Sequence, residues 1–248
     1  LGIMKTYFIS DLHLGSPSHE ASLVREKAFV QWLDHAAQDA EAIYLVGDIF
    51  DFWFEYQRAV PRGFVRCLGK IAELSDRGIP IYWFTGNHDM WIFDYLPKEC
   101  GITLLRKPIS IERYGHSLYI GHGDGLGPGD HAYKFMKAFF DSSICQWLFA
   151  RLHPNFGIWL ASSMSGYSRG KAVEKDKIFH GNQEWLFQYC QDMEKTKHHD
   201  LYIFGHRHFP GEMKVNDSSS YWNLGDWLHH YTYGVLDNNG FELKTWSV

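Results

Sequence analysis

Short apolar runs rich in aromatic and β-branched residues recur along the chain and predict strands. Two longer segments, residues 20–38 and 62–77, separate the first three of these runs and carry apolar residues at helical spacing. The second of these segments ends at Gly78, a residue type that commonly terminates helices. The apolar runs occupy residues 7–9, 43–46, 81–84, 118–120 and 201–204. Strands that alternate with helices predict a layered α/β domain.

The pattern changes after Asp124. A run containing Gly and Pro at residues 125–130 is typical of a hinge, and the pattern from residue 131 to about 195 is almost entirely helical. Strands return at residue 201 and continue as hairpins toward the end of the chain. We therefore expect a core made of residues 1–125 and 197–248. Residues 126–196 are expected to be a helical cap inserted into this core.

Each of the five apolar runs is followed by a short polar block. These blocks are Asp11-Leu12-His13, Gly47-Asp48, Gly86-Asn87-His88-Asp89, Gly121-His122-Gly123-Asp124 and Gly205-His206-Arg207-His208. One such block alone is weak, because polar residues are common at ordinary junctions between strands and turns. Side chains at the carboxyl ends of strands converge on one crevice in open α/β sheets. Five blocks of carboxylate, amide and imidazole groups therefore favour a site for two divalent metal ions.

Composition narrows the class of protein. The chain has 248 residues, 45% of them apolar, which is enough for a sizeable core, and its net charge of −5 gives no reason to expect nucleic acid as a partner. Four widely separated cysteines favour reduced thiols in a cytoplasmic protein over a disulfide framework. No apolar stretch approaches the roughly 18 residues of a membrane-spanning helix. Composition leaves the oligomeric state open.

The order of these motifs resembles that of the calcineurin-like metallophosphoesterases. This resemblance implies a four-layer α/β/β/α sandwich with a helical cap insertion, and two divalent ions, with Mn²⁺ the first expectation and Zn²⁺ or Fe²⁺ also compatible. It further implies one ion at Asp11, His13, Asp48 and His208, and a second ion at Asp48, Asn87, His122 and His206. Asp48 would bridge the two ions, because a carboxylate has two acceptor oxygens.

The resemblance also implies roles for residues that are not ligands. His88 would contact the phosphate and protonate the leaving oxygen, since imidazole titrates near neutral pH. Asp89 would orient His88, and Asp124 would support the ligand histidines. Capping of a turn is the simpler alternative for both aspartates.

A closer resemblance is to the bacterial UDP-2,3-diacylglucosamine diphosphatases of lipid A biosynthesis. Residues 9–14, 47–53 and 130–133 carry it, together with the helical insert after residue 124. It implies hydrolysis of the pyrophosphate bond to UMP and 2,3-diacylglucosamine 1-phosphate. Expected contacts with the acylated nucleotide-sugar are Asn87, His88, Asp130, Tyr133, Ser168, Lys175 and His206.

One residue departs from that closer family. Well-known members have arginine after the metal-binding asparagine, whereas this chain has His88. The histidine restores the general phosphoesterase pattern. Another metallophosphodiesterase or a nucleotide pyrophosphatase therefore stays open as an alternative. A non-catalytic metal-binding scaffold is the more remote alternative.

The predicted cap is unusually apolar for a surface insertion, with many aromatic residues between residues 135 and 160. These side chains can form a small core of their own. Alternatively, part of this surface faces acyl chains or the membrane. Basic residues such as Lys175 would then meet phosphate groups, although solvated surface lysines are an equally simple explanation. The second alternative predicts peripheral attachment to the cytoplasmic face of the inner membrane.

Overall fold

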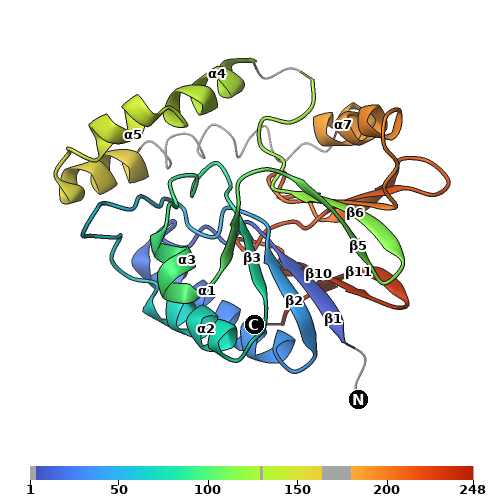
Figure 1. Ribbon diagram of the computed structural model, residues 1–248, viewed down its shortest axis with the longest axis horizontal. Helices are drawn as coiled ribbons and strands as arrows, with labels where there is room; N and C mark the ends of the chain where they lie inside the picture. Colours follow the sequence, from blue (N-terminus) through green and yellow to red (C-terminus); the bar gives the residue numbers. More distant parts are fainter. Residues whose placement is uncertain (1–3, 129–130, 164–179, 248) are drawn as a thin grey trace.

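Two β-sheets stacked face to face form the centre of the molecule (Figure 1), a computed structural model that describes residues 4–128, 131–163 and 180–247. The first sheet has the strand order β11-β10-β1-β2-β3-β4. Its strands are β1 Lys5–Ile9, β2 Ala40–Leu45, β3 Ile81–Phe84, β4 Thr103–Leu105, β10 Thr232–Asp237 and β11 Gly240–Thr245. Strands β1 to β4 are parallel, whereas β10 is antiparallel to β1 and to β11.

The second sheet has the order β5-β6-β7-β9-β8. Its strands are β5 Ile109–Arg113, β6 His116–Gly121, β7 Leu201–Phe204, β8 Gly211–Lys214 and β9 Ser220–Asn223. Strands β6, β7 and β9 are mutually parallel, so their carboxyl ends meet at one edge. The turn between β5 and β6 has positive φ at Tyr114 and Gly115, which is the geometry that a two-residue hairpin needs.

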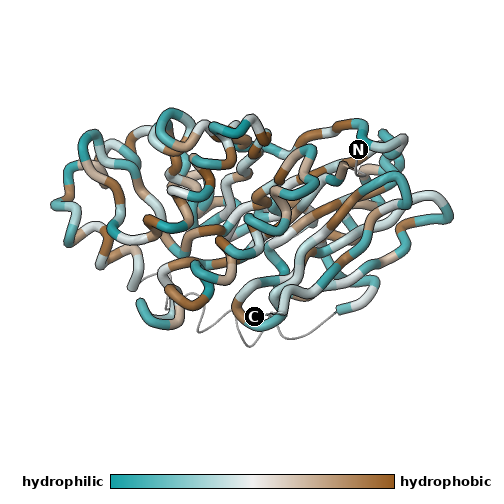
Figure 2. Tube along the Cα trace, turned by 90° about the horizontal axis from the view of Figure 1, so that it is seen from below, coloured by the Kyte–Doolittle hydropathy of each residue, from teal (hydrophilic) through white to brown (hydrophobic). Residues whose placement is uncertain are grey.

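Alternation along the strands divides the core into layers. In β2, Ile43 and Leu45 pack toward the helices, whereas Ala42 and Tyr44 pack between the two sheets. Because successive side chains of a strand point to opposite faces, a strand buried on both faces is a continuous apolar run. Figure 2 shows apolar stretches along the trace, with hydrophilic residues in many of its outer turns.

Helices cover both outer faces. Helices α1 His19–Ala36, α2 Val65–Asp76 and α3 Tyr95–Cys100 cover the first sheet. Helix α7 Trp185–Glu194, which follows the short 3-10 helix η1 Gly181–Gln183, covers the second sheet and buries Leu186, Phe187 and Cys190 against it. The predicted four-layer α/β/β/α sandwich is therefore confirmed. Helix α7 is also the crossover between parallel strands β6 and β7, although it lies inside the range predicted to be cap.

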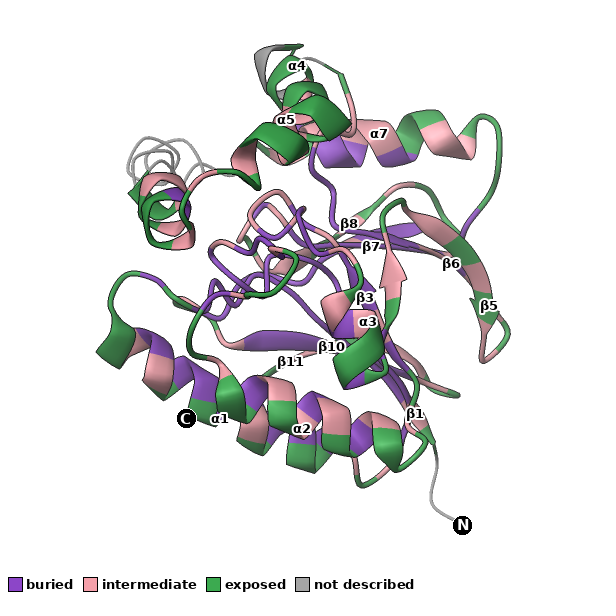
Figure 3. Ribbon diagram, turned by 60° about the vertical axis from the view of Figure 1, so that its left-hand side comes forward, coloured by how far each residue is buried: buried purple, intermediate pink, exposed green. Residues whose placement is uncertain are grey.

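The remaining helices lie apart from these layers. Helices α4 His131–Phe140 and α5 Ser143–Phe149, with a further helical segment at 154–163, lie on the side of the molecule opposite the N-terminus (Figures 1 and 3). The Phe149 ring lies 4.6 Å from that of Phe54 and 4.7 Å from that of Trp91, and Trp91 Nε1 donates to the Phe140 carbonyl at 2.9 Å. Among the described helices, none has the length and apolar character to span a bilayer.

Candidate metal centre

The predicted ligands lie where parallel strands end, in a backbone conformation that residues other than glycine seldom adopt. Five of them have positive φ, namely Asp11 at 55°, His13 at 45°, Asp48 at 54°, His206 at 66° and His208 at 55°. This left-handed geometry is uncommon outside glycine and costs free energy, so it persists only where the surroundings impose it. The turns at these strand ends bring the ligand side chains close together.

Asp11, His13 and His208 form one group of donor atoms. Asp11 Oδ1 lies 3.3 Å from His208 Nε2 and 3.8 Å from His13 Nε2, and the two imidazole nitrogens are 3.3 Å apart. Donors that share one ion at about 2.0–2.2 Å must lie roughly 3–4 Å from one another. The three atoms therefore have the spacing of ligands to a single ion.

Asp48, His122 and His206 form the second group. Asp48 Oδ2 lies 3.3 Å from His122 Nε2. Asn87 Oδ1 joins this group, at 3.2 Å from His122 Nε2 and 3.0 Å from His206 Nδ1. The four predicted ligands of the second ion are thus brought together.

The carboxylates of Asp11 and Asp48 are arranged alike. Each uses one oxygen to accept a backbone N–H from a neighbouring loop: Asp11 Oδ2 from His206 at 2.9 Å, and Asp48 Oδ1 from His88 at 2.8 Å. The second oxygen of each then faces imidazoles. Asp48 Oδ2 lies 3.3 Å from His122 Nε2 and 3.9 Å from His13 Nε2, so it faces both groups. This is the position that a bridging carboxylate needs.

The charges of the site fit a cation. Burial opposes ionisation of Asp48, but the imidazoles of His122 and His88 outweigh it and hold the pKa of this carboxyl well below its usual range. Burial likewise opposes the charge on His122, yet the Asp48 carboxylate raises the pKa of that imidazole to about 10. Asp11 Oδ1 is buried and accepts no well-directed hydrogen bond. Acceptor oxygens and imidazoles around an unsatisfied buried oxygen are a donor set that suits a hard or borderline divalent ion.

His88 lies beside these groups, with its ring 4.8 Å from that of His13. Its Nδ1 lies 3.1 Å from the Asp51 carbonyl oxygen, which can only accept, so the proton of the neutral ring is held on Nδ1. Burial lowers the pKa of His88. The main chain of Asp51 therefore orients the ring, the role that we expected of Asp89.

Asp89 has a different position from the expected one. Its Oδ1 accepts the Gly86 N–H at 2.7 Å and its Oδ2 accepts the Ile49 N–H at 3.0 Å. Burial and the neighbouring charge of Asp48 raise the pKa of Asp89 to about 7. This side chain joins the loop that carries Asp48 to the loop that carries Asn87. The alternative reading, a carboxylate that caps a turn, describes it better.

Asp124 is buried at the end of β6, where the charge of the nearby His122 lowers its pKa against the effect of burial. Its Oδ2 lies 2.5 Å from the Nζ of Lys137 on α4. The expected cap contacts Asp130, Ser168 and Lys175 lie outside the described residues, and so does the side chain of Tyr133.

Two glycines of the motifs are required because a neighbouring loop passes too close to leave room for a Cβ atom. A Cβ on Gly86 would lie 2.6 Å from the Asp48 backbone nitrogen, and a Cβ on Gly205 would overlap the Asp11 carboxylate. Backbone atoms cannot yield in the way that a flexible side chain can. The glycines before Asn87 and His206 therefore allow neighbouring strand ends to come close enough for their ligands to meet.

Our interpretation of the sequence missed several supporting residues. Arg25 of α1 is buried and donates to the backbone carbonyls of Leu12 at 3.0 Å and His13 at 2.9 Å. Arg207 is paired with Glu184, with Nε to Oε2 at 2.8 Å, which joins the last motif to the start of α7. No local periodicity predicts these contacts, because each joins a helix or its start to a loop of a different motif.

Our interpretation of the sequence also missed Asp226, although the pattern of an apolar run followed by polar residues could have revealed it. The apolar run Tyr221-Trp222 in β9 is followed by Asn223 and Asp226, a sixth polar block at the end of a strand. Asp226 Oδ2 lies 3.3 Å from His208 Nδ1.

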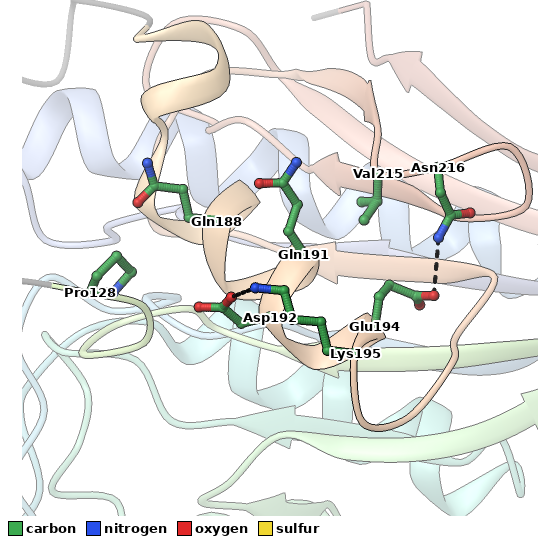
Figure 4. Close-up of a pocket in the computed structure, with 8 residues that line it drawn as sticks. All are labelled: Pro128, Gln188, Gln191, Asp192, Glu194, Lys195, Val215 and Asn216. Carbon is green, nitrogen blue, oxygen red and sulfur yellow. Dashed lines mark hydrogen bonds and ion pairs between the residues drawn. The ribbon is translucent and has the colours of Figure 1, made fainter.

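A cavity of about 570 Å³ lies elsewhere, on the outer side of α7 (Figure 4). Its polar contacts are local, with Asn216 donating to Glu194 at 3.1 Å and Lys195 paired with Asp192 at 2.6 Å. It is lined by Pro128, Gln188, Gln191, Asp192, Glu194, Lys195, Val215 and Asn216. None of these is a predicted ligand, so this cavity is separate from the candidate metal centre.

Comparison with known proteins gives the family. Residues 4–210 match the family model of the calcineurin-like phosphoesterases. A protein of Porphyromonas gingivalis named UDP-2,3-diacylglucosamine hydrolase is 37% identical over 97% of both chains. Proteins of the same name from Edwardsiella ictaluri and Shewanella pealeana are 31% and 28% identical, over 97% of this chain and over 91% and 97% of their own.

The chain belongs to the calcineurin-like phosphoesterase family. The class of enzyme expected from the motifs, a metal-dependent hydrolase, is thereby confirmed together with the fold.

Proposed function

We propose that this enzyme hydrolyses the pyrophosphate bond of UDP-2,3-diacylglucosamine, releasing UMP and 2,3-diacylglucosamine 1-phosphate in lipid A biosynthesis. One observation carries the proposal: two groups of ligand atoms meet at Asp48 Oδ2, in a chain that aligns with hydrolases named for this substrate along nearly its whole length. A site for two cations suits cleavage between phosphoryl groups, because positive charge must meet the charge that develops in the transition state.

We propose that two divalent ions are bound, with Mn²⁺ the first choice. One would be held by Asp11, His13, Asp48 and His208, and the other by Asp48, Asn87, His122 and His206. Such ions, when bound, act as Lewis acids toward the phosphoryl oxygens and lower the pKa of bound water. The contribution of the chain is to hold seven ligand side chains at fixed positions through buried backbone contacts.

His88 would act on the phosphate as a catalytic residue. Its Nδ1 is engaged with the Asp51 carbonyl, so Nε2 is the nitrogen that exchanges a proton with the substrate. Burial favours the neutral ring, but an anionic pyrophosphate next to it would favour the imidazolium form. A proton could then pass from Nε2 to the leaving oxygen. Asn87 and His206 lie close enough to contact the same phosphate.

The cap would bind the acyl chains, and we place its C-terminal limit before α7, because α7 covers the second sheet. Large apolar side chains of the described cap helices are exposed, including Phe135 at 77%, Ile144 at 72% and Trp159 at 62% (Figure 3). This exposure supports contact of the cap with lipid, and it argues against the alternative that these side chains pack against one another in a small core. Asp130, Tyr133, Ser168 and Lys175 remain the proposed polar contacts with the nucleotide-sugar.

The same surface would attach the enzyme peripherally to the cytoplasmic face of the inner membrane. The exposed Arg151, whose guanidinium lies over the ring of Trp147, would meet lipid phosphates from this surface. Sedimentation with vesicles of anionic lipid tests this. The expected result is binding that weakens in a Phe135→Ser/Ile144→Ser variant without loss of turnover on a water-soluble phosphodiester. Wild-type protein that stays in the supernatant would exclude the attachment.

The test of the function compares UDP-2,3-diacylglucosamine with the deacylated UDP-sugar at equal enzyme and Mn²⁺. We expect efficient hydrolysis of the acylated substrate only, since each buried CH₂ contributes about 0.8 kcal/mol. If part of that contribution arises only in the transition state, turnover falls along with affinity. Equal efficiency would point to a nucleotide pyrophosphatase or another phosphodiesterase, the alternative that His88 favours. Absence of turnover on either substrate would point to a scaffold.

A further inference from the structure

The carboxyl end of β9 brings a residue outside the family motifs to the metal centre. Strand β9 is the parallel neighbour of β7, so the segment after Asn223 lies beside the segment after Phe204. Asn223 Nδ2 donates to the Gly205 carbonyl at 2.6 Å, which joins these two strand ends directly. Three residues further on, the carboxylate of Asp226 is 1% exposed.

Both oxygens of this carboxylate are engaged. Oδ2 faces His208 Nδ1 at 3.3 Å. Oδ1 accepts the backbone N–H groups of His229 at 2.7 Å and His230 at 3.1 Å, and it also lies 3.3 Å from His230 Nδ1. The next residue, Trp227, donates its backbone N–H to the Asp11 carbonyl at 3.0 Å. The Asp226 segment thus contacts both Asp11 and His208.

We infer that Asp226 is a positioning residue that holds the proton of neutral His208 on Nδ1. The opposite nitrogen, Nε2, then presents its lone pair at 3.3 Å from Asp11 Oδ1. Only a deprotonated imidazole nitrogen can ligate a metal ion, so the tautomer of His208 decides whether it can ligate. The inference rests on the ligand set in the proposed function. It assigns a role to a residue outside that set.

The imidazole of His122 is also oriented by a hydrogen-bond acceptor at its Nδ1, but this acceptor is a backbone carbonyl. Its Nδ1 donates to the Val46 carbonyl at 2.8 Å, while its Nε2 faces Asp48. A carboxylate accepts more strongly than a carbonyl and makes the imidazole a better ligand. The group of Asp11, His13 and His208 therefore depends on a side chain that mutation can remove, whereas His122 depends on the main chain.

The contacts of Asp226 determine what asparagine would do in its place. The amide oxygen must occupy the Oδ1 position, because two backbone N–H groups need an acceptor there. The amide NH₂ would then face His208 Nδ1 and require it to accept. The proton of the neutral ring would move to Nε2, the nitrogen proposed to ligate. An asparagine in place of a histidine-orienting aspartate selects the wrong tautomer in this way in serine proteases.

The test measures Mn²⁺ and Zn²⁺ affinity by competition with a chelating dye, in wild type and Asp226→Asn. We expect one of the two ions to bind about 10–100-fold more weakly in the variant, with the other unaffected. A second readout is the ¹⁵N spectrum of the Zn²⁺-loaded proteins, in which His208 Nδ1 should carry the proton in wild type but not in the variant. His230→Ala is the matched control, because it touches the same carboxylate from the exposed side, and it should leave both readouts unchanged.

Asp226→Ser is the second variant if Asp226→Asn does not fold. Its hydroxyl can still accept a backbone N–H of the turn but is too short to orient His208, so weaker binding of one ion is again expected. Wild-type affinity for both ions in the folded variants would overturn the inference, as would an unchanged tautomer. Neither readout involves substrate. An enzyme that binds two ions but leaves UDP-2,3-diacylglucosamine intact would refute the proposed function alone.

Discussion

Lys137 of helix α4 reaches across to the core, where its Nζ lies 2.5 Å from Oδ2 of the buried Asp124. This ion pair links the cap to the loop that carries His122. We predict that Lys137→Met weakens hydrolysis of the acylated substrate through a higher KM, because α4 loses an anchor beside the site. The magnitude should be about 1–2 kcal/mol, since the lysine is partly exposed. Steady-state kinetics with both acylated and water-soluble substrates checks this.

The matched control for that variant is Lys195→Met, which removes a surface pair with Asp192 on α7. It should leave both KM values unchanged. A double-mutant cycle of Lys137 and Asp124 should show a coupling free energy well above zero. Additive effects would mean that the pair does not hold the cap.

Asp48 faces both groups of ligand atoms, so its loss should affect both ions. We predict that Asp48→Ala retains neither ion after dialysis, whereas Asn87→Ala retains one. The physical reason is that Asp48 Oδ2 lies within reach of His122 and of His13, while the Asn87 contacts go to the second group only. Metal analysis of protein purified without chelator gives the result. Two ions and full turnover in Asp48→Ala would contradict the bridging role.

His88 is expected to act in the transition state and not in metal binding. We predict that His88→Asn lowers kcat by about 10²–10⁴-fold while both ions stay bound, as for removal of a general acid. The measurement pairs turnover with metal content. The control is His116→Asn, because His116 lies at the start of β6, whereas the ligand His122 follows the end of that strand. Loss of an ion in His88→Asn would show that this residue is a ligand or supports one.

Gly86 permits the close approach of its strand end to Asp48. We predict that Gly86→Ala destabilises the fold by about 1–3 kcal/mol and weakens metal binding, because its Cβ would collide with the Asp48 backbone. Gly69→Ala is the opposite case. It lies in α2 with open space around its Cβ and should stabilise the protein by about 0.5–1 kcal/mol. Urea unfolding of both variants, with metal analysis, checks the contrast, and equal effects would contradict it.

Glu194 provides a dependence of stability on pH that is separate from the metal centre. Burial opposes its charge, but hydrogen bonds from Tyr202 and from the His199 backbone outweigh burial and lower its pKa to about 2. A carboxyl with a lowered folded-state pKa stabilises the fold above its unfolded value of 4.5, and this contribution is lost as the pH falls toward 2.

We predict that Glu194→Gln flattens the pH dependence of the free energy of unfolding between about pH 5 and 2. Urea titrations at several pH values measure it. Glu112→Gln, exposed on β5, is the control and should follow wild type. A variant whose profile stays parallel to that of wild type would show that these hydrogen bonds do not persist in solution.

The sequence by itself predicted a layered α/β core and a meeting of polar side chains at the ends of its strands, whereas the four-layer order and the division of the ligands between two ions came from the family resemblance. A strand buried on both faces must be a continuous apolar run, and the polar residue that follows it must leave the sheet at its edge. Asp11, Asp48, His122 and His206 could therefore be assigned to one crevice from local order alone.

Only the tertiary structure decided which side chains support those ligands. Arg25 reaches the Leu12 carbonyl from a helix, and Asp226 reaches His208 from a different strand. Such contacts join segments whose separation along the chain has no pattern, so no local periodicity reports them. The placement of α7 is a similar case, because a helix with one apolar face packs equally well on a cap or on a sheet. Its position follows from the crossover between β6 and β7, which is a property of the whole fold.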